Sequence, residues 1–202
     1  MGTRTRPMTK EQTDAFIAVL NNAPDSELPY AAAAAIALGT GARIGEVLRM
    51  RVKDLFTPDG TPRERVSRDI EKRRSAVRLT IPFPWERMGA AVIRWHAAKR
   101  IKGQEQLFIG RTRKTCYYHQ QTLLRRAGLA ATGTGFHGLR KTCLLRFYNS
   151  FARRFGEHNP TVWRKVQFLA GHTRIDNTLI YLDNDRDGAS DPEIRAAWQN
   201  DE

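Results

Sequence analysis

The sequence is poor in the residues that build disulfide scaffolds and membrane spans. It has two cysteines among 202 residues, Cys116 and Cys143, and they form no Cys-x-x-Cys pair. This argues against a disulfide framework and against a zinc site made of thiolates. No apolar run approaches the roughly 20 residues that a membrane-spanning helix needs, and the N-terminal stretch MGTRTRPMTKEQ lacks the apolar core of a signal peptide. We therefore expect a cytoplasmic protein without a membrane partner.

Acidic residues are scarce relative to basic ones. The chain has 21 Asp and Glu against 34 Lys and Arg, a net charge of +13 and a pI near 10.4. Arginine outnumbers lysine by 26 to 8, and its planar fork suits bidentate contacts with phosphate oxygens. This surplus predicts a polyanionic partner, nucleic acid above all. An arginine-rich base composition in the source genome would give the same surplus without such a partner.

Clusters of metal-binding carboxylates and histidines are also missing. The segment DNDRDG, residues 183–188, begins like a calcium-binding EF-hand loop, but the twelfth position holds Ile194 where a bidentate glutamate is needed. We interpret this segment as a solvated acidic linker. No cofactor and no metal are expected.

Apolar residues at helical spacing dominate the chain. Thr9 and Gln12 form a capping-box pattern at the start of the first helix. The second predicted helix is nearly all alanine, so we expect it to be buried. The predicted helices are Thr9–Asn22, Leu28–Leu38, Ala42–Met50, Trp85–Lys99, Lys114–Ala127, His137–Arg154 and Thr161–Ala170, with short ones at Asp176–Leu182 and Pro192–Gln199.

The segment after the third helix changes to the alternation of apolar and polar residues that is typical of strands. Val52–Leu55, Arg65–Ile70 and Ala76–Phe83 show it, separated by the turn residues PDG and by the basic tip EKRRS, residues 71–75. The chain has no internal repeat and no long hydrophilic break. We therefore predict one α+β domain, mostly α-helical, with a small antiparallel sheet in its N-terminal third.

Two fragments carry candidate anion-binding residues. In TGARIGEVLRM, residues 40–50, Arg43 follows the glycine-bounded end of one predicted helix and stands near the start of the next. In GFHGLRKT, residues 135–142, His137 and Arg140 are three apart and share a face at a helix N-terminus, a natural seat for a phosphate. Taken alone, Arg43 is better explained as an ordinary surface arginine, and His137 is explained equally well as a helix cap.

The third fragment is AGHTRIDNTLIYL, residues 170–182. Gly171 permits a tight break between helices, His172 follows it, and Tyr181 comes nine residues after His172 near the end of a short apolar stretch. A tyrosine in an apolar helix face is by itself an ordinary core residue. The three fragments together are much less expected by chance.

In order and spacing the three fragments resemble the active-site boxes of the tyrosine recombinases, the phage-type integrases. The resemblance runs from about residue 9 to residue 182 and includes the β region with its hairpin. The motifs that carry it are Arg43 within TGARIGEVL, His137-x-x-Arg140 within HGLRKT, and Gly171-His172 followed by Tyr181.

The resemblance implies a site-specific DNA recombinase that uses neither ATP nor a metal. A tyrosine hydroxyl attacks a phosphodiester to give a 3′-phosphotyrosyl bond and a free 5′-hydroxyl, and the 5′-hydroxyl of a second strand reverses the step. Arginine forks hold the non-bridging oxygens, one histidine adds a hydrogen bond to a phosphate oxygen, and the other assists proton transfer. The implied residues in these roles are Arg43 and Arg140, His172, His137, and the nucleophile Tyr181.

The general acid for the leaving 5′-oxygen is, by the same resemblance, a lysine on the β hairpin. Lys72 is the only lysine in the predicted hairpin and is therefore assigned this role. The tip EKRRSA is more basic than the short glycine-bearing turn usual in the family and is spaced differently.

The expected organisation is a catalytic domain over residues 1–182, with a short basic arm at residues 1–8, followed by an acidic linker and tail at residues 183–202 that could contact another subunit. The resemblance implies double-stranded DNA as the partner, a homotetramer on paired sites, and a bacterial, phage or plasmid setting. DNA integration, excision, inversion and resolution remain open as biological roles. Two other functions also remain open: a type IB-like topoisomerase and a non-catalytic DNA-binding regulator of the same fold.

Overall fold

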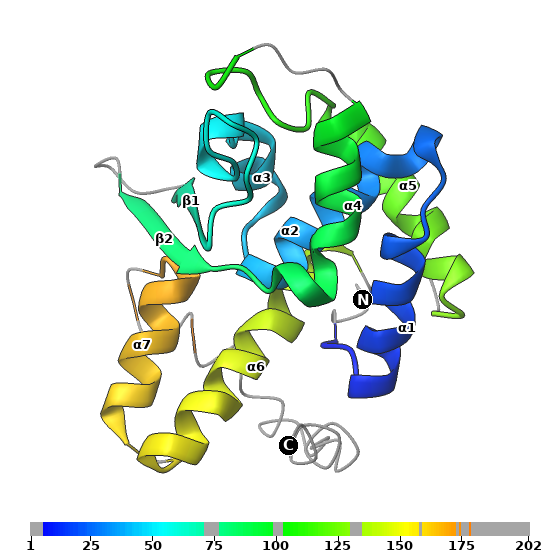
Figure 1. Ribbon diagram of the computed structural model, residues 1–202. Helices are drawn as coiled ribbons and strands as arrows, with labels where there is room; N and C mark the ends of the chain where they lie inside the picture. Colours follow the sequence, from blue (N-terminus) through cyan, green and yellow to red (C-terminus); the bar gives the residue numbers. More distant parts are fainter. Residues whose placement is uncertain are drawn as a thin grey trace.

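A computed structural model of the chain describes residues 6–70, 77–98, 103–129, 135–157, 159–172, 174 and 178. Helices predominate, and one two-stranded antiparallel sheet lies beside them (Figure 1). The α+β fold predicted from the sequence is therefore confirmed. The described helices are α1 Lys10–Asn21, α2 Leu28–Thr40, α3 Ile44–Arg49, α4 Trp85–Ala98, α5 Arg113–Arg126, α6 Phe136–Phe155 and α7 Pro160–Ala170, with short 3₁₀ turns η1 Asp25–Glu27 and η2 Val52–Asp54.

The alanine-rich helix α2 forms the centre of the fold. All of its residues are buried, and α1, α4, α5 and α6 pack around it. Alanine suits this place because it favours helix and lets neighbouring helices approach closely. Helix α2 ends at Gly41, whose φ of 66° is in the left-handed region that favours glycine. The predicted capping box is also present at α1, where Thr9 accepts a hydrogen bond from the backbone of Gln12 and the side chain of Gln12 returns one.

The sheet consists of β1 Arg65–Asp69 and β2 Arg78–Pro82, with Ser67 opposite Thr80. The strand predicted at Val52–Leu55 is wrong, because this segment forms η2. The carboxylate of Asp54 accepts a hydrogen bond from the backbone N–H of Arg51 at 2.7 Å and so closes a turn. The aspartate side chain offers the backbone a hydrogen bond that competes with strand pairing. A pattern of four alternating residues does not show this competition.

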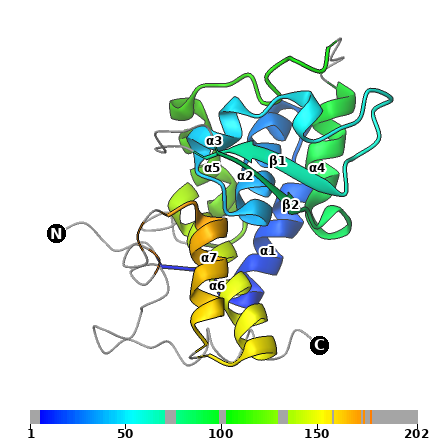
Figure 2. The ribbon, with the colours of Figure 1, turned by 90° about the vertical axis from the view of Figure 1, so that its left-hand side faces the viewer.

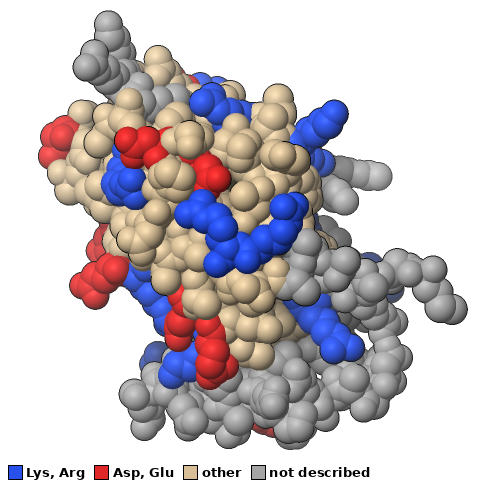
Figure 3. All heavy atoms as spheres, turned by 90° about the vertical axis from the view of Figure 1, so that its right-hand side faces the viewer, with Lys and Arg blue, Asp and Glu red and all other residues tan. Residues whose placement is uncertain are grey.

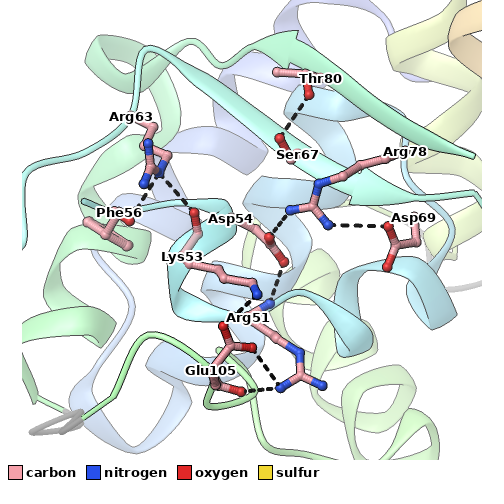
Figure 4. A network of polar contacts seen from close by, with 10 residues as sticks. All are labelled: Arg51, Lys53, Asp54, Phe56, Arg63, Ser67, Asp69, Arg78, Thr80 and Glu105. Atoms are coloured by element: carbon pink, nitrogen blue, oxygen red, sulfur yellow. Dashed lines mark hydrogen bonds and ion pairs between the residues drawn. The ribbon is translucent and has the colours of Figure 1, made fainter. Parts of the chain in front are cut away.

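Ionic contacts attach the hairpin to the segment before it (Figure 4). Arg78 on β2 pairs with both Asp54 and Asp69. Lys53 and Arg51 hold Glu105 in the loop that follows α4. Because most of these side chains are partly exposed, the contacts contribute to the orientation of the hairpin more than to overall stability.

Helices α6 and α7 form an antiparallel pair whose far end lies away from the sheet, and the C-terminal end of α7 returns to β1 (Figure 2). Asn159 caps the start of α7 by accepting a hydrogen bond from the backbone of Thr161. Gly171 ends α7 with a φ of 65°. A Cβ atom at Gly171 would lie 2.6 Å from Cγ2 of Ile70, so only glycine fits between the helix end and the hairpin.

Several predicted features lie outside the described residues: the hairpin tip at 71–76, the short helices at 176–182 and 192–199, and the linker and tail at 183–202. Within the described part of the chain, no helix is both long and apolar enough to cross a membrane.

The turn at Gly171 predicts a graded set of glycine-to-alanine variants. Gly128→Ala introduces only the cost of a side chain at positive φ, because nothing lies within 4 Å of a Cβ there. Gly171→Ala adds a clash with Ile70, so it should lower the free energy of unfolding by a further 1–3 kcal/mol, roughly the cost of overpacking a core site. Urea unfolding of both variants measures the difference, with the open position Gly103→Ala as control. Equal losses for Gly171→Ala and Gly128→Ala would show that the close approach to Ile70 is not tight.

Candidate active site

Arg43 stands at the N-cap of α3, directly after the end of α2. Its backbone N–H donates to Oε2 of Glu46 at 3.0 Å, and its Nη1 donates to Oε1 of the same carboxylate at 2.9 Å. The side chain of Arg43 is 22% exposed, whereas that of Glu46 is fully buried. The prediction that Arg43 projects from a helix start is confirmed, and the structure adds the carboxylate that orients it.

Arg140, in the first turns of α6, is buried and joins the ends of two other helices. Its Nη1 donates to the carbonyl oxygen of Gly41 after α2, and its Nη2 donates to that of Ala170 at the end of α7. A cation at the C-terminal end of a helix is stabilised by the helix dipole. Arg140 is thus held in place by backbone groups from two helices that are distant in the sequence.

His172 follows the Gly171 turn and is buried against Arg140. Its Nε2 lies 3.1 Å from Nη2 of Arg140 and its Nδ1 lies 3.0 Å from Oγ1 of Thr178. A guanidinium can only donate, so Nε2 is the acceptor and Nδ1 carries the proton. Burial, with the charges of Arg140 and Arg43, lowers the pKa of His172 to about 4. The ring is therefore neutral at physiological pH.

His137 lies one turn before Arg140 and, unlike it, is exposed. Partial desolvation lowers the pKa of His137, and the positive charges of Lys141, Arg140 and Arg43 lower it further. The His137 ring in turn contributes to the lowered pKa of His172. The four described residues of the predicted set, Arg43, His137, Arg140 and His172, are therefore brought together.

Two residues of the site, Arg68 and Glu46, are absent from the sequence prediction. Arg68 on β1 is buried, and its guanidinium pairs with Glu46. Arg68 also donates from Nη2 to the carbonyl oxygen of Leu169 at 2.7 Å. Burial lowers the pKa of Arg68, and the adjacent carboxylate opposes that effect. Arg43 and Arg68 thus share one carboxylate, and Arg140 lies beside His172 in the same cluster. With three guanidinium groups and one carboxylate, the cluster is strongly cationic and suited to an anion.

Lys72 and Tyr181 lie outside the described residues, but the chain limits their distance from the site. Thr178, buried against His172, is three residues before Tyr181, so their Cα atoms are at most about 11 Å apart. Ile70, packed on Gly171, is two residues before Lys72, which gives a limit of about 7 Å for that pair.

Acidic residues are almost absent from one long stretch in the second half of the chain. Residues 106–175 contain thirteen Lys and Arg but a single acidic residue, Glu157. In the first half, carboxylates accompany the basic groups, as in the ion pairs Arg87–Asp14 and Arg94–Asp25. On the side of the molecule that bears α1 and α5, acidic and basic side chains lie near one another (Figure 3). The surplus of positive charge therefore lies mainly in residues 106–175, which include α5, α6 and α7.

No three His, Cys, Asp or Glu side chains within the described residues lie close enough together to hold a metal ion. The site as described is built from guanidinium, imidazole and hydroxyl groups and the carboxylate of Glu46. These groups can bind an anion and transfer protons.

Comparison with known proteins identifies the family. The sequence model of the Phage integrase family matches residues 6–187. The chain belongs to the phage integrase family. The match includes Lys72 and Tyr181 as well as the described site, and it confirms the family resemblance found in the sequence. No curated protein matches the chain.

Solved structures of this integrase fold are similar to the chain, although their sequences are distant. XerA recombinase superposes with a TM-score of 0.67 at 16% identity, covering 98% of this chain and 64% of its own. XerH site-specific recombinase bound to a palindromic difH substrate gives 0.65 at 16% identity, covering 90% and 50%. A lambda integrase (75–356) dimer bound to a COC′ core site gives 0.59 at 17% identity, covering 92% and 62%. The integrase chain thus spans about half to two thirds of the length of these proteins.

The lowered pKa of His172 predicts that acid destabilises this integrase. Between pH 6.5 and pH 4 the unfolded chain binds a proton at His172 that the folded chain does not, so stability falls as the pH falls through this window. The loss from this residue should be on the order of 2–3 kcal/mol between pH 7 and pH 4. Urea unfolding of wild type and His172→Gln at intervals across this range measures it. An identical pH dependence of stability in the two proteins would contradict the lowered pKa of His172.

Proposed function

We propose that the chain is a site-specific DNA recombinase that cleaves and rejoins DNA through a 3′-phosphotyrosyl intermediate. The observation that carries the proposal is the cationic cluster of the partly exposed Arg43 and the buried Arg140 and Arg68, with His172 and His137 beside it. Membership of the phage integrase family supports it. XerH and lambda integrase, which share the fold, were solved with DNA.

In the proposed reaction the hydroxyl oxygen of Tyr181 attacks the scissile phosphorus. The bond from phosphorus to the 5′-oxygen breaks, a 3′-phosphotyrosyl bond forms, and the 5′-oxygen leaves with a proton. Attack by a 5′-hydroxyl of a second strand then releases the tyrosine, so bond energy is conserved and no ATP is consumed. Lys72 supplies the proton to the leaving oxygen, and His137 assists the transfer of the tyrosine proton.

Arg43 and Arg140 hold the non-bridging oxygens, where negative charge increases in the transition state. His172 adds a hydrogen bond to one of these oxygens. In the DNA-free chain, Nε2 of His172 accepts a hydrogen bond from Arg140. In the proposed complex, a hydrogen bond to a phosphate oxygen replaces it. A bound phosphate anion raises the pKa of His172 and favours a donating Nε2–H.

The contact between Thr178 and His172 supports the role of Tyr181. Thr178 is buried and hydrogen-bonded to the ring, and Tyr181 is three residues further along the sequence. Three residues of chain span at most about 11 Å. This short connection to a residue that contacts His172 supports Tyr181 as the nucleophile.

Replacing the nucleophile tests the chemistry directly. Tyr181→Phe should abolish the covalent protein–DNA adduct on a nicked duplex taken from the DNA flanking the gene, because no hydroxyl remains to attack. DNA affinity should change by less than about threefold, since a tyrosine hydroxyl contributes little to phosphate-dominated binding. Denaturing gels detect the adduct and fluorescence anisotropy measures the affinity. Tyr117→Phe, an exposed tyrosine on α5, is the matched control and should form adduct normally. Adduct formation by Tyr181→Phe would refute the role of Tyr181.

We further propose that the chain acts as a homo-oligomer on paired sites, as a lambda integrase tetramer was solved on a Holliday junction. A type IB-like topoisomerase uses the same nucleophile but does not exchange partners, and a regulator of the same fold would not cleave. The family match and the described set of site residues favour recombination over both.

Plasmid substrates separate these functions. A recombinase should convert a plasmid carrying two copies of the flanking repeat into recombinant products and should leave a plasmid without the repeat supercoiled. Agarose gels and restriction mapping distinguish exchange from relaxation. Relaxation of both plasmids without exchange would favour the topoisomerase, and binding without any cleavage would favour the regulator.

A further inference from the structure

We propose that Arg68 is a positioning residue for strand cleavage, which aligns Arg43 through the carboxylate they share and ties both to the turn that carries His172. The inference rests on the proposed function, because it concerns how that site is held ready. Arg68 does not contact the scissile phosphate in this proposal. It acts on the residues that do.

The first part of the argument is the shared carboxylate. Oε2 of Glu46 accepts from the backbone N–H of Arg43 and also from the guanidinium of Arg68, while Oε1 accepts from Nη1 of Arg43. One buried carboxylate is thus divided between two arginines. Without Arg68, Oε2 of Glu46 would lose the donor that competes there with Arg43. The Arg43 cation would then be paired more tightly with Glu46 and would be less available to a phosphate.

The second part is the other end of the same guanidinium. Nη2 of Arg68 donates to the carbonyl oxygen of Leu169, and Nη2 of Arg140 donates to the next carbonyl, that of Ala170. Two arginines from different elements therefore hold the last two residues of α7. The turn at Gly171 and then His172 follow immediately. Loss of Arg68 would remove one of the contacts that fix the direction in which His172 leaves the helix.

The third part is the placement of Arg68 in the strand. The exposed and buried residues of β1 alternate, and Arg68 is on the buried side with Val66. An arginine is rarely fully buried unless it is paired, and burying it is costly. A buried arginine on the inner face of a short strand therefore has a specific task. Its two Nη groups point to acceptors on two other elements, which a lysine ammonium cannot reproduce with the same geometry.

The test compares Arg68→Met with Arg65→Met in single-turnover adduct formation. The probe is the nicked flanking duplex, and protein is present at saturation. Arg65 is on the same strand, is exposed, and donates a hydrogen bond to the carbonyl oxygen of Thr80 on β2, so its variant should react like wild type. Arg68→Met should bind DNA within about threefold of wild type but form adduct about 100-fold more slowly, a typical cost of misplaced catalytic groups. Arg68→Lys, which keeps the charge without the fork, should fall between them.

A second substrate separates positioning from general damage to the fold. With a neutral methylphosphonate in place of the scissile phosphate, there is less charge for Arg43 to hold, so the deficit of Arg68→Met should shrink to a few-fold. A variant that has merely lost structure would be equally slow on both substrates. Equal deficits on the two substrates, or wild-type rates on both, would overturn the proposal. Absence of adduct with wild-type protein would instead count against the proposed function itself.

Discussion

The site depends on hydrogen bonds from buried guanidinium groups to the carbonyl oxygens at helix ends. Helices α2 and α7 come from opposite halves of the chain, and both end at a glycine in the left-handed region. The terminal carbonyls that such ends leave without helical partners accept hydrogen bonds from Arg140 and Arg68. These bonds satisfy the carbonyls and place positive charge against the negative ends of two helix dipoles. The same bonds bring Arg43 and His172 to one place.

The interior of the fold is arranged to make this possible. The small residues of α2 allow four helices to approach it, so its end lies deep in the molecule and not at the surface. Gly171 allows the end of α7 to reach within van der Waals contact of Ile70 on the hairpin. Glu46 then offsets part of the charge that would otherwise be buried without compensation. The core thus stabilises a cluster whose own burial is costly.

Much of this could be predicted from the sequence, because helices with strong periodicity and the boxes around Arg43, Arg140 and His172 are local patterns. The burial of α2 followed from its alanine content, and the cap at Thr9 from its spacing to Gln12. Glu46 was within reach of prediction, since it stands three residues after the N-cap Arg43. Arg68 was harder, because its partners Glu46 and Leu169 are 22 and 101 residues away. The error at Val52–Leu55 arose from one aspartate that closes a turn.

The charge of the cluster bears on how it would stabilise a reaction. Three guanidinium groups and one carboxylate leave an excess of two positive charges, and the neutral His172 adds none. A phosphodiester carries one negative charge, and its pentacoordinate transition state formally carries two. The two excess positive charges of the cluster therefore match the negative charge of the transition state more closely than that of the bound substrate. Such a match accelerates the chemical step, whereas equal stabilisation of both states would only tighten binding. Because the guanidinium groups are already fixed by carbonyls and by Glu46, little reorganisation is needed when that charge develops.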